Sequence, residues 1–265
     1  MIGIFDSGIG GLTLVREVLK QLPQYRIVYF GDTARTPYGT KSPRTITEYA
    51  LEDTEFLLKQ GAQIIVVACN SVSAVAADVL RETFRVPIFE VIAPAVRTTL
   101  ALTRSRRVGI IGTRATIGSG VYERSLKALD SEIRVYSHPC PLLVPLVEEG
   151  WLKRPETKQI VRKYLYPLKR QQVDTLVLGC THYPLWKGII QTKIGRRVRV
   201  IDSSQEAAGW VKAYLEEDPL LAGRLSPAVG EGGGHRFFVS DLTPNAEAIA
   251  RDFLGREITL EVAGG

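Results

Sequence analysis

Two cysteines of this sequence follow apolar segments that resemble each other. Cys69 ends the run IIVVAC, Cys180 ends the run LVLGC, and polar residues follow both directly. Two thiols that face one ligand from opposite sides could take a proton from a carbon on one face and return a proton on the other, which inverts the stereocentre. The pattern therefore favours acid–base chemistry at carbon, with one cysteine as base and the other as acid.

A purely structural role is the alternative for each cysteine, because free cysteine usually behaves as a small buried apolar side chain. Cys140, in HPCPLL, lacks the polar residues that follow the other two, and we assign it to the core. Cys69 and Cys180 are each expected at a helix N-terminus, where free N–H groups bind anions and lower the pKa of a thiol. Three cysteines without a CxxC pair predict neither a disulfide framework nor a zinc site, so we expect no metal.

Short β-rich runs alternate with amphipathic helical stretches over the first 95 residues. The runs IGIFD, YRIVYF, QIIVVA and VPIFEV have strand character, and the segments between them have helical spacing. This order predicts an α/β fold with a parallel sheet that has helices on both faces. Ligands bind such sheets at the carboxyl ends of the strands, which is where Asp6, Ser7, Asp32 and Cys69 fall.

The same pattern then begins again, which indicates an internal duplication. Four segments match in the same order at offsets between 106 and 112 residues. We predict two similar parallel-sheet α/β domains related by a pseudo-two-fold axis, with the active site between them. The first domain would comprise residues 1–95 and about 208–265, with the C-terminal tail packed back on it, and the second residues 96–207. The matched pairs are Gly3 and Gly109, Arg26 and Arg134, Cys69 and Cys180, and Glu90 and Asp202.

Composition narrows the classes of function. The chain has 265 residues, 45% of them hydrophobic and 23% charged, with a formal net charge of +6. The basic residues are spread out, so we expect no nucleic-acid partner. The longest uncharged stretch is 61–77 and polar residues interrupt it, so we expect no membrane span. The N-terminal residues enter a strand pattern without a signal-peptide pattern, and we expect a cytoplasmic protein.

Six stretches together resemble glutamate racemase, in the order in which that family has them: GIFDSGIGGLTLVREV, YFGDTARTPYGTKS, VVACNSVSA, VIAPA, GIIGTRATI and LGCTHYPLW. The resemblance runs from Ile2 to about Ser204. It implies a racemase that interconverts L- and D-glutamate with two thiols and no cofactor, and that supplies D-glutamate for peptidoglycan precursors, hence for cell-wall synthesis and cell shape. It also implies a homodimer. The lysines fall mostly on polar helix faces or loops, which agrees with the absence of a pyridoxal cofactor.

The resemblance also implies residue roles. Cys69 would take the proton from the D-isomer and Cys180 from the L-isomer. Asp6 would assist Cys69 and also contact the substrate, and His182 would assist Cys180 with Glu149, or its neighbour Glu148, behind it. The family has threonine where this chain has Ser71, so the hydroxyl is kept. The residues expected to bind substrate are Asp6, Ser7, Tyr38, Gly39, Asn70, Ser71, Thr181 and His182.

Most of these assignments have a structural alternative. Asp6 could be a helix N-cap, and Tyr38-Gly39 could be only a turn after a proline. His182 could be a structural histidine, and Glu149 could be a solvated surface acid.

Three other functions stay open at this stage. One is an aspartate or hydantoin racemase, which would use the same cysteine pair. Another is a thiol hydrolase or lyase with one nucleophilic cysteine, which the symmetry of the duplication disfavours. The third is a non-enzymatic binding protein for acidic metabolites, or a partner of nucleic-acid enzymes, in which the cysteines would be dispensable.

Overall fold

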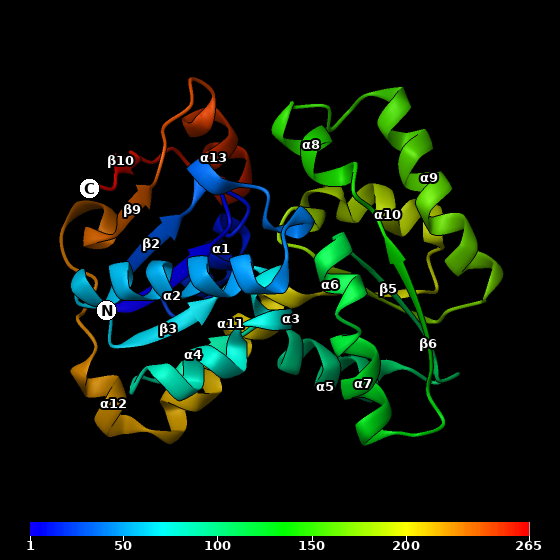
Figure 1. The fold of residues 1–265 in the computed structure, drawn as a ribbon, viewed down its shortest axis with the longest axis horizontal. Helices are drawn as coiled ribbons and strands as arrows, with labels where there is room; N and C mark the ends of the chain where they lie inside the picture. The colour runs from blue at the N-terminus through cyan, green and yellow to red at the C-terminus, as the bar shows by residue number, and fades with distance from the viewer. Residues whose placement is uncertain (265) are drawn as a thin grey trace.

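The computed structural model describes residues 1–264 and contains two parallel β-sheets with helices on both sides (Figure 1). The first sheet has six strands in the order β10-β9-β2-β1-β3-β4, and the second has four in the order β6-β5-β7-β8. The strands are β1 (Ile2–Asp6), β2 (Ile27–Gly31), β3 (Ile64–Val67), β4 (Ile88–Glu90), β5 (Arg107–Gly112), β6 (Arg134–Pro139), β7 (Thr175–Gly179), β8 (Arg199–Asp202), β9 (Arg236–Val239) and β10 (Glu261–Val262).

The two sheets repeat one arrangement. The order β2-β1-β3-β4 in the first sheet has its counterpart in β6-β5-β7-β8 in the second, and all of these pairs are parallel. β1 and β5 are the central strands that the offset of 106 residues equates, and β3 and β7 are the strands that precede Cys69 and Cys180. The α/β class with two similar parallel sheets is confirmed, and the repeat seen in the sequence is a repeat of strand order.

The C-terminal tail adds two strands to the first sheet. β9 pairs with β2 and β10 pairs with β9, both in parallel. The tail therefore packs on the first half, as the sequence suggested, while the exact domain limits stay a prediction. Helix α11 (Ser203–Glu217) lies against both α1 (Leu12–Gln21) and α5 (Ile92–Leu102), so it joins the two halves.

The remaining helices cover the faces of the sheets. The segment between β3 and β4 forms two helices that meet at Ala76, and the first of them begins directly after Cys69. Four short 3-10 helices span Thr33–Arg35, Tyr38–Thr40, Tyr183–Trp186 and Glu231–Gly234. The other helices are α2 (Pro43–Lys59), α3 (Asn70–Val75), α4 (Ala77–Thr83), α6 (Arg114–Gly118), α7 (Val121–Leu129), α8 (Leu143–Glu148), α9 (Pro155–Arg170), α10 (Lys187–Ile194), α12 (Pro219–Arg224) and α13 (Ala246–Leu254).

Burial explains why the central strands read as unbroken apolar runs. Every residue of β1, β3 and β7 is buried, because helices cover both faces of a parallel sheet. The edge strand β6 is only partly buried. Within the described residues, no helix is long and apolar enough to cross a membrane. Rigid central strands thus end at the boundary between the two halves and fix the residues that follow them.

Candidate active site

The carboxyl ends of β1, β3, β5 and β7 meet around one small cavity between the two halves. Its volume is about 20 Å³, which is room for about one water molecule. Nine of the residues predicted from the sequence border this cavity, including both Cys69 and Cys180. The lining consists of Ser7, Thr36, Pro37, Tyr38, Gly39, Cys69, Asn70, Ser71, Thr113, Val144, Cys180, Thr181 and His182.

Cys69 lies at the end of β3 and is the N-cap residue of α3. Its side chain is buried, and its thiol donates a hydrogen bond to Ser7 Oγ at 3.5 Å. Burial, followed by the nearby Asp6 carboxylate, raises the pKa of Cys69 to about 12. The expectation that the helix N-terminus lowers this pKa is therefore wrong, because desolvation outweighs a helix of only six residues. Cys69 rests as a thiol, which is the form that can donate a proton.

Cys180 follows β7 and has a different environment. A 3-10 helix, Tyr183–Trp186, follows it in place of the α-helix expected from the sequence. Its sulfur lies 3.9 Å from His182 Nδ1. Burial disfavours the charged imidazole, but hydrogen bonds to Cys180 and Glu148 outweigh burial and raise the pKa of His182 to about 10. The imidazole of His182 therefore carries its proton beside the sulfur of Cys180.

The acid behind His182 is Glu148. His182 Nε2 lies 3.1 Å from Glu148 Oε1. The prediction that Glu149 is the acid next to His182 is therefore wrong. Glu149 is the C-cap residue of α8 and is exposed. One helical residue corresponds to a rotation of about 100°, so two adjacent acids at a helix end point in different directions, and only the backbone decides which one reaches the histidine.

Asp6 lies just behind the cavity wall, between the two halves. Its carboxylate is fully buried, accepts a hydrogen bond from the Gly11 N–H at 2.9 Å, and lies 3.4 Å from Thr181 Oγ1. Burial raises the pKa of Asp6 to about 6, although His182 and these hydrogen bonds act in the opposite direction. Asp6 does not border the cavity here, so the expected direct contact with substrate would need Asp6 or its neighbours to move.

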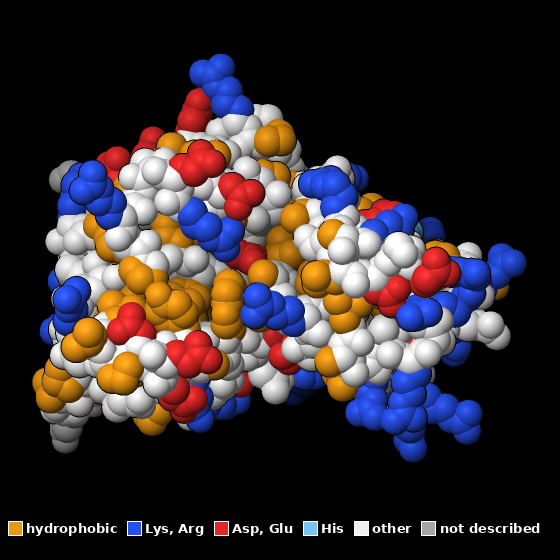
Figure 2. Space-filling view, turned by 90° about the horizontal axis from the view of Figure 1, so that it is seen from below, with side chains coloured by type: hydrophobic (Ala, Val, Ile, Leu, Met, Phe, Trp, Pro, Cys, Tyr) orange, Lys and Arg blue, Asp and Glu red, His pale blue; other side chains and the backbone are white. Residues whose placement is uncertain are grey.

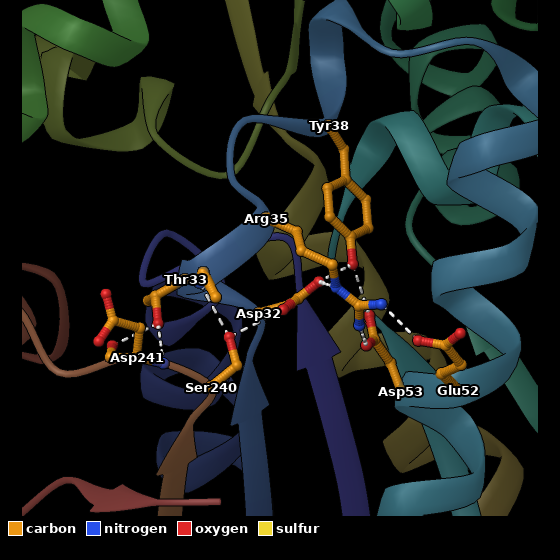
Figure 3. A network of polar contacts seen from close by, with 9 residues as sticks. Asp32, Thr33, Arg35, Tyr38, Glu52, Asp53, Ser240 and Asp241 are labelled. Atoms are coloured by element: carbon orange, nitrogen blue, oxygen red, sulfur yellow. Dashed lines mark hydrogen bonds and ion pairs between the residues drawn. The ribbon is translucent and has the colours of Figure 1, made fainter. Parts of the chain in front are cut away.

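Tyr38 and Gly39 border the cavity through the short 3-10 turn that contains them. The Tyr38 hydroxyl points toward Asp32 and Asp53 and is hydrogen-bonded to both (Figure 3). Because these two contacts occupy the hydroxyl, the backbone of this turn is the candidate for binding a carboxylate ligand. Gly39 packs directly on Thr113 of the other half, where an added Cβ would lie 2.6 Å from the Thr113 Cβ.

Hydroxyl and amide groups complete the wall across the boundary between the halves. Ser71 Oγ lies 2.9 Å from Thr113 Oγ1. Asn70 donates to Ser203 Oγ at 3.2 Å and accepts from Tyr122 Oη at 2.8 Å. These contacts fix the two residues that follow Cys69 against the second half of the molecule.

Thr36, Pro37, Thr113 and Val144 belong to the lining but were missed in the sequence. Thr113 carried a usable signal, because the offset of 106 residues that relates Gly3 to Gly109 also relates Ser7 to Thr113. The duplication thus places a hydroxyl after both central strands. Val144 lies on α8 and offers no comparable pattern.

The site has no arrangement typical of a metal centre. In the part of the chain that the structure describes, no group of three or more His, Cys, Asp or Glu side chains could hold a metal ion. Both cysteines border the cavity, one from each half, and one of them lies beside a protonated imidazole, an arrangement that suits proton transfer at carbon.

Comparison with known proteins agrees with this class. Residues 10–210 match the family model described as Asp/Glu/Hydantoin racemase, and the chain belongs to this family of amino-acid racemases. The chain is 46% identical to a glutamate racemase of Geobacter metallireducens, over 97% of this chain and 93% of that protein.

Solved structures extend the similarity to the whole fold. The glutamate racemase isoform RacE1 from Bacillus anthracis is 37% identical and superposes with a TM-score of 0.92, over 100% of this chain and 97% of that chain. The glutamate racemase of Francisella tularensis in complex with D-glutamate is 37% identical with a TM-score of 0.90, over 99% and 97% of the two chains.

Proposed function

We propose that the protein is a glutamate racemase that uses Cys69 and Cys180 as its two acid–base groups, without a cofactor. The observation that carries this proposal is the position of the two sulfurs, since they follow equivalent strands of the two sheets and border one cavity from the two halves. The similarity to relatives named glutamate racemase supports glutamate over aspartate or hydantoins as the substrate.

In every turnover one cysteine of the pair takes a proton from the substrate and the other gives a proton to it. With L-glutamate bound, the Cys180 thiolate takes the α-proton, and the electron pair of the broken C–H bond stays on the α-carbon. The Cys69 thiol then gives its proton to the opposite face of that carbon, which forms the new C–H bond and leaves a thiolate at Cys69. The reverse sequence converts D-glutamate to L-glutamate.

The surroundings of the two sulfurs suit these two roles. Burial holds Cys69 as a thiol ready to donate, while protonated His182, with Glu148 behind it, stands beside Cys180. Asp6 is near enough to Cys69 to influence its pKa and assists when Cys69 acts as base. The carbanion-like transition state needs stabilisation from polar groups that are already in place, and the N–H groups and hydroxyls around the cavity provide it.

The substrate has two carboxylates, and the wall offers donors for both. The backbone of Tyr38 and Gly39, with the Ser7 hydroxyl, would hold one carboxylate, and Asn70, Ser71 and Thr181 would hold the other. A cavity of about 20 Å³ is too small for glutamate, so binding requires the two halves to move apart.

The product D-glutamate would serve peptidoglycan precursors and hence cell-wall synthesis and cell shape. We also propose a cytoplasmic location and a homodimer, both on the similarity to the relatives.

The first test is incubation with L-glutamate in deuterated water, without pyridoxal phosphate. Optical rotation and α-deuterium would be followed together for the native protein, Cys69→Ser and Cys180→Ser, with L-aspartate as the alternative substrate. We expect loss of rotation with one α-deuterium per inversion, on glutamate and in the native protein only.

Each other outcome selects another function. Exchange on aspartate and not on glutamate would identify an aspartate racemase. The absence of exchange on any amino acid, with glutamate binding unchanged in both serine variants, would favour the binding-protein alternative and refute the racemase.

A further inference from the structure

A cluster of buried polar side chains lies beneath the turn that forms one wall of the cavity (Figure 3). We define the Tyr38 cluster as Asp32, Arg35, Tyr38 and Asp53. Asp32 follows β2, Arg35 and Tyr38 belong to the two 3-10 turns after it, and Asp53 lies in the middle of α2. The two carboxylates are buried, with exposed fractions of 0% for Asp32 and 1% for Asp53. Neither borders the cavity, and the proposed mechanism gives neither a role.

The hydrogen bonds of this cluster cannot all form if both carboxyl groups are ionised. The Tyr38 hydroxyl has one proton to donate, yet its oxygen is bonded to both Asp32 Oδ2 and, at 3.0 Å, Asp53 Oδ2. Since an ionised carboxylate only accepts, one of the two carboxyl groups must carry a proton and donate it to the tyrosine oxygen.

The other contacts show which carboxyl group holds that proton. Asp32 accepts from the Tyr38 hydroxyl, from Arg35 Nε at 2.5 Å and from Ser240 Oγ at 2.8 Å, which suits an anion. Asp53 Oδ1 accepts from Arg35 Nη2 at 3.1 Å, which leaves Asp53 Oδ2 to carry the proton that faces Tyr38.

The charges around Asp53 agree with this assignment. Burial, followed by the neighbouring charge of Asp32, raises the pKa of Asp53 well above its ordinary value, and the attraction of Arg35 does not offset them. Glu52, on the same helix, adds to this repulsion. Tyr29 of β2 is a further titratable group near Asp53.

The cluster determines where one wall of the cavity stands. The ring of Tyr38 runs from the cluster to the turn whose Tyr38 and Gly39 border the cavity, and Gly39 in turn packs on Thr113 of the other half. A shift of the hydroxyl therefore moves backbone that meets both the cavity and the opposite half. Ser240, which follows β9, connects the C-terminal tail to the same cluster.

We propose that Asp53 is a positioning residue: its neutral carboxyl group donates to Tyr38 and thereby holds the Tyr38–Gly39 turn in the place where it can bind substrate. The role of Asp53 in substrate binding rests on the proposed racemase function. The hydrogen-bond direction does not, because it follows from the contacts of the cluster alone. Asp32 is the anionic partner that balances Arg35.

Two substitutions of Asp53 distinguish a neutral hydrogen-bond donor to Tyr38 from an ionised partner of Arg35. In Asp53→Asn the amide keeps the shape, donates to Tyr38 and accepts from Arg35, so KM for glutamate should stay within about threefold of the native value. Asp53→Ala removes one hydrogen-bond partner of the Tyr38 oxygen. We expect KM for glutamate to rise about tenfold and kcat to change less than about threefold. The exposed Glu55→Gln, on the same helix, is the matched control and should leave both constants unchanged.

Asp32, the anion of the cluster, should not tolerate the change to asparagine that Asp53 tolerates. Asp32→Asn removes the buried negative charge beside Arg35, so its KM should rise at least as much as that of Asp53→Ala. Tyr38→Phe should resemble Asp53→Ala, and the double variant should add little, because both changes break the same contact. Equal damage from Asp53→Asn and Asp53→Ala would overturn the proposal, as would a loss confined to kcat.

A measurement without substrate tests the protonation by itself. A buried acid that keeps its proton destabilises the fold increasingly as pH rises above its pKa in the unfolded chain. Asp53→Asn should therefore gain stability toward urea relative to the native protein between pH 4.5 and 7.5. A constant or falling difference would overturn the neutral assignment even if the protein does not act on glutamate. No turnover by the native protein, with the expected urea result, would refute only the racemase function.

Discussion

Asp6 provides a test in which stability and activity move in opposite directions. Its carboxylate is fully buried, and burial raises its pKa from 3.8 to about 6. Between these values the folded protein keeps a proton that the unfolded chain releases, so the stability of the native protein falls as pH rises. A difference of one in pKa corresponds to about 1.4 kcal/mol. The ionised Asp6 therefore costs the fold about 3 kcal/mol at and above neutral pH.

Asp6→Asn removes this cost, because the amide does not titrate and its oxygen can still accept from the Gly11 N–H. The free energy of unfolding of the variant minus that of the native protein should grow by about 2.4 kcal/mol between pH 4 and pH 7, because a small part of the full difference is already present at pH 4, and should then level off. Racemisation should fall at the same time, since the proposed mechanism needs the carboxylate beside Cys69. A more stable and less active variant is typical of substitutions at strained catalytic sites.

Urea titrations at pH 4, 5, 6, 7 and 8, analysed by linear extrapolation, measure this difference. Asp252→Asn, on the exposed face of α13, is the matched control, and its curve should run parallel to that of the native protein because this carboxylate stays in contact with water. A difference for Asp6→Asn that is flat with pH, or that shrinks toward neutral pH, would show that burial does not govern Asp6.

The other predictions concern single contacts in the site. Glu148→Gln should lower kcat for L-glutamate about ten- to a hundredfold because it loses the carboxylate bonded to the imidazole, while Glu149→Gln should change it less than twofold. Equal effects of the two substitutions would contradict the assignment of Glu148 as the acid bonded to His182. Gly39→Ala should raise KM about tenfold or more, since its Cβ would lie 2.6 Å from the Cβ of Thr113, and an unchanged KM would mean that the halves need not meet there. Alkylation of Cys69 by iodoacetamide, followed by mass spectrometry, should accelerate about tenfold per pH unit up to about pH 10 because its pKa is about 12; a plateau below pH 9 would contradict that value.

The local sequence pattern was sufficient to predict the strands and the residues that follow them. Parallel strands covered on both sides must be apolar throughout, so their ends are visible as the first polar residues, at Asp6, Asn70 and Thr181. The duplication was visible for the same reason, and its offset also marks Thr113, which was overlooked. The burial of Asp53 has a faint signal too, because it shares the buried face of α2 with Ile46, Ala50 and Leu57.

Side-chain direction and protonation could not be obtained in this way. Glu148 and Glu149 are equivalent in pattern, and the rotation between successive helical residues selects the first. The Tyr38 hydroxyl points into the cluster because Asp32 and Asp53, 21 residues apart, converge on it only in the folded chain. The thiol of Cys69 was expected to be acidified by a helix N-terminus, and burial has the larger effect.

The sequence by itself thus determined the α/β class, the repeated strand order and the two cysteines at equivalent strand ends, because each of these depends on residues that are neighbours along the chain. Only the tertiary structure decided which acid supports His182, which carboxyl group of the Tyr38 cluster holds a proton, and how small the cavity is. These features depend on desolvation and on contacts between segments distant in the chain, and both arise only when the two halves pack together.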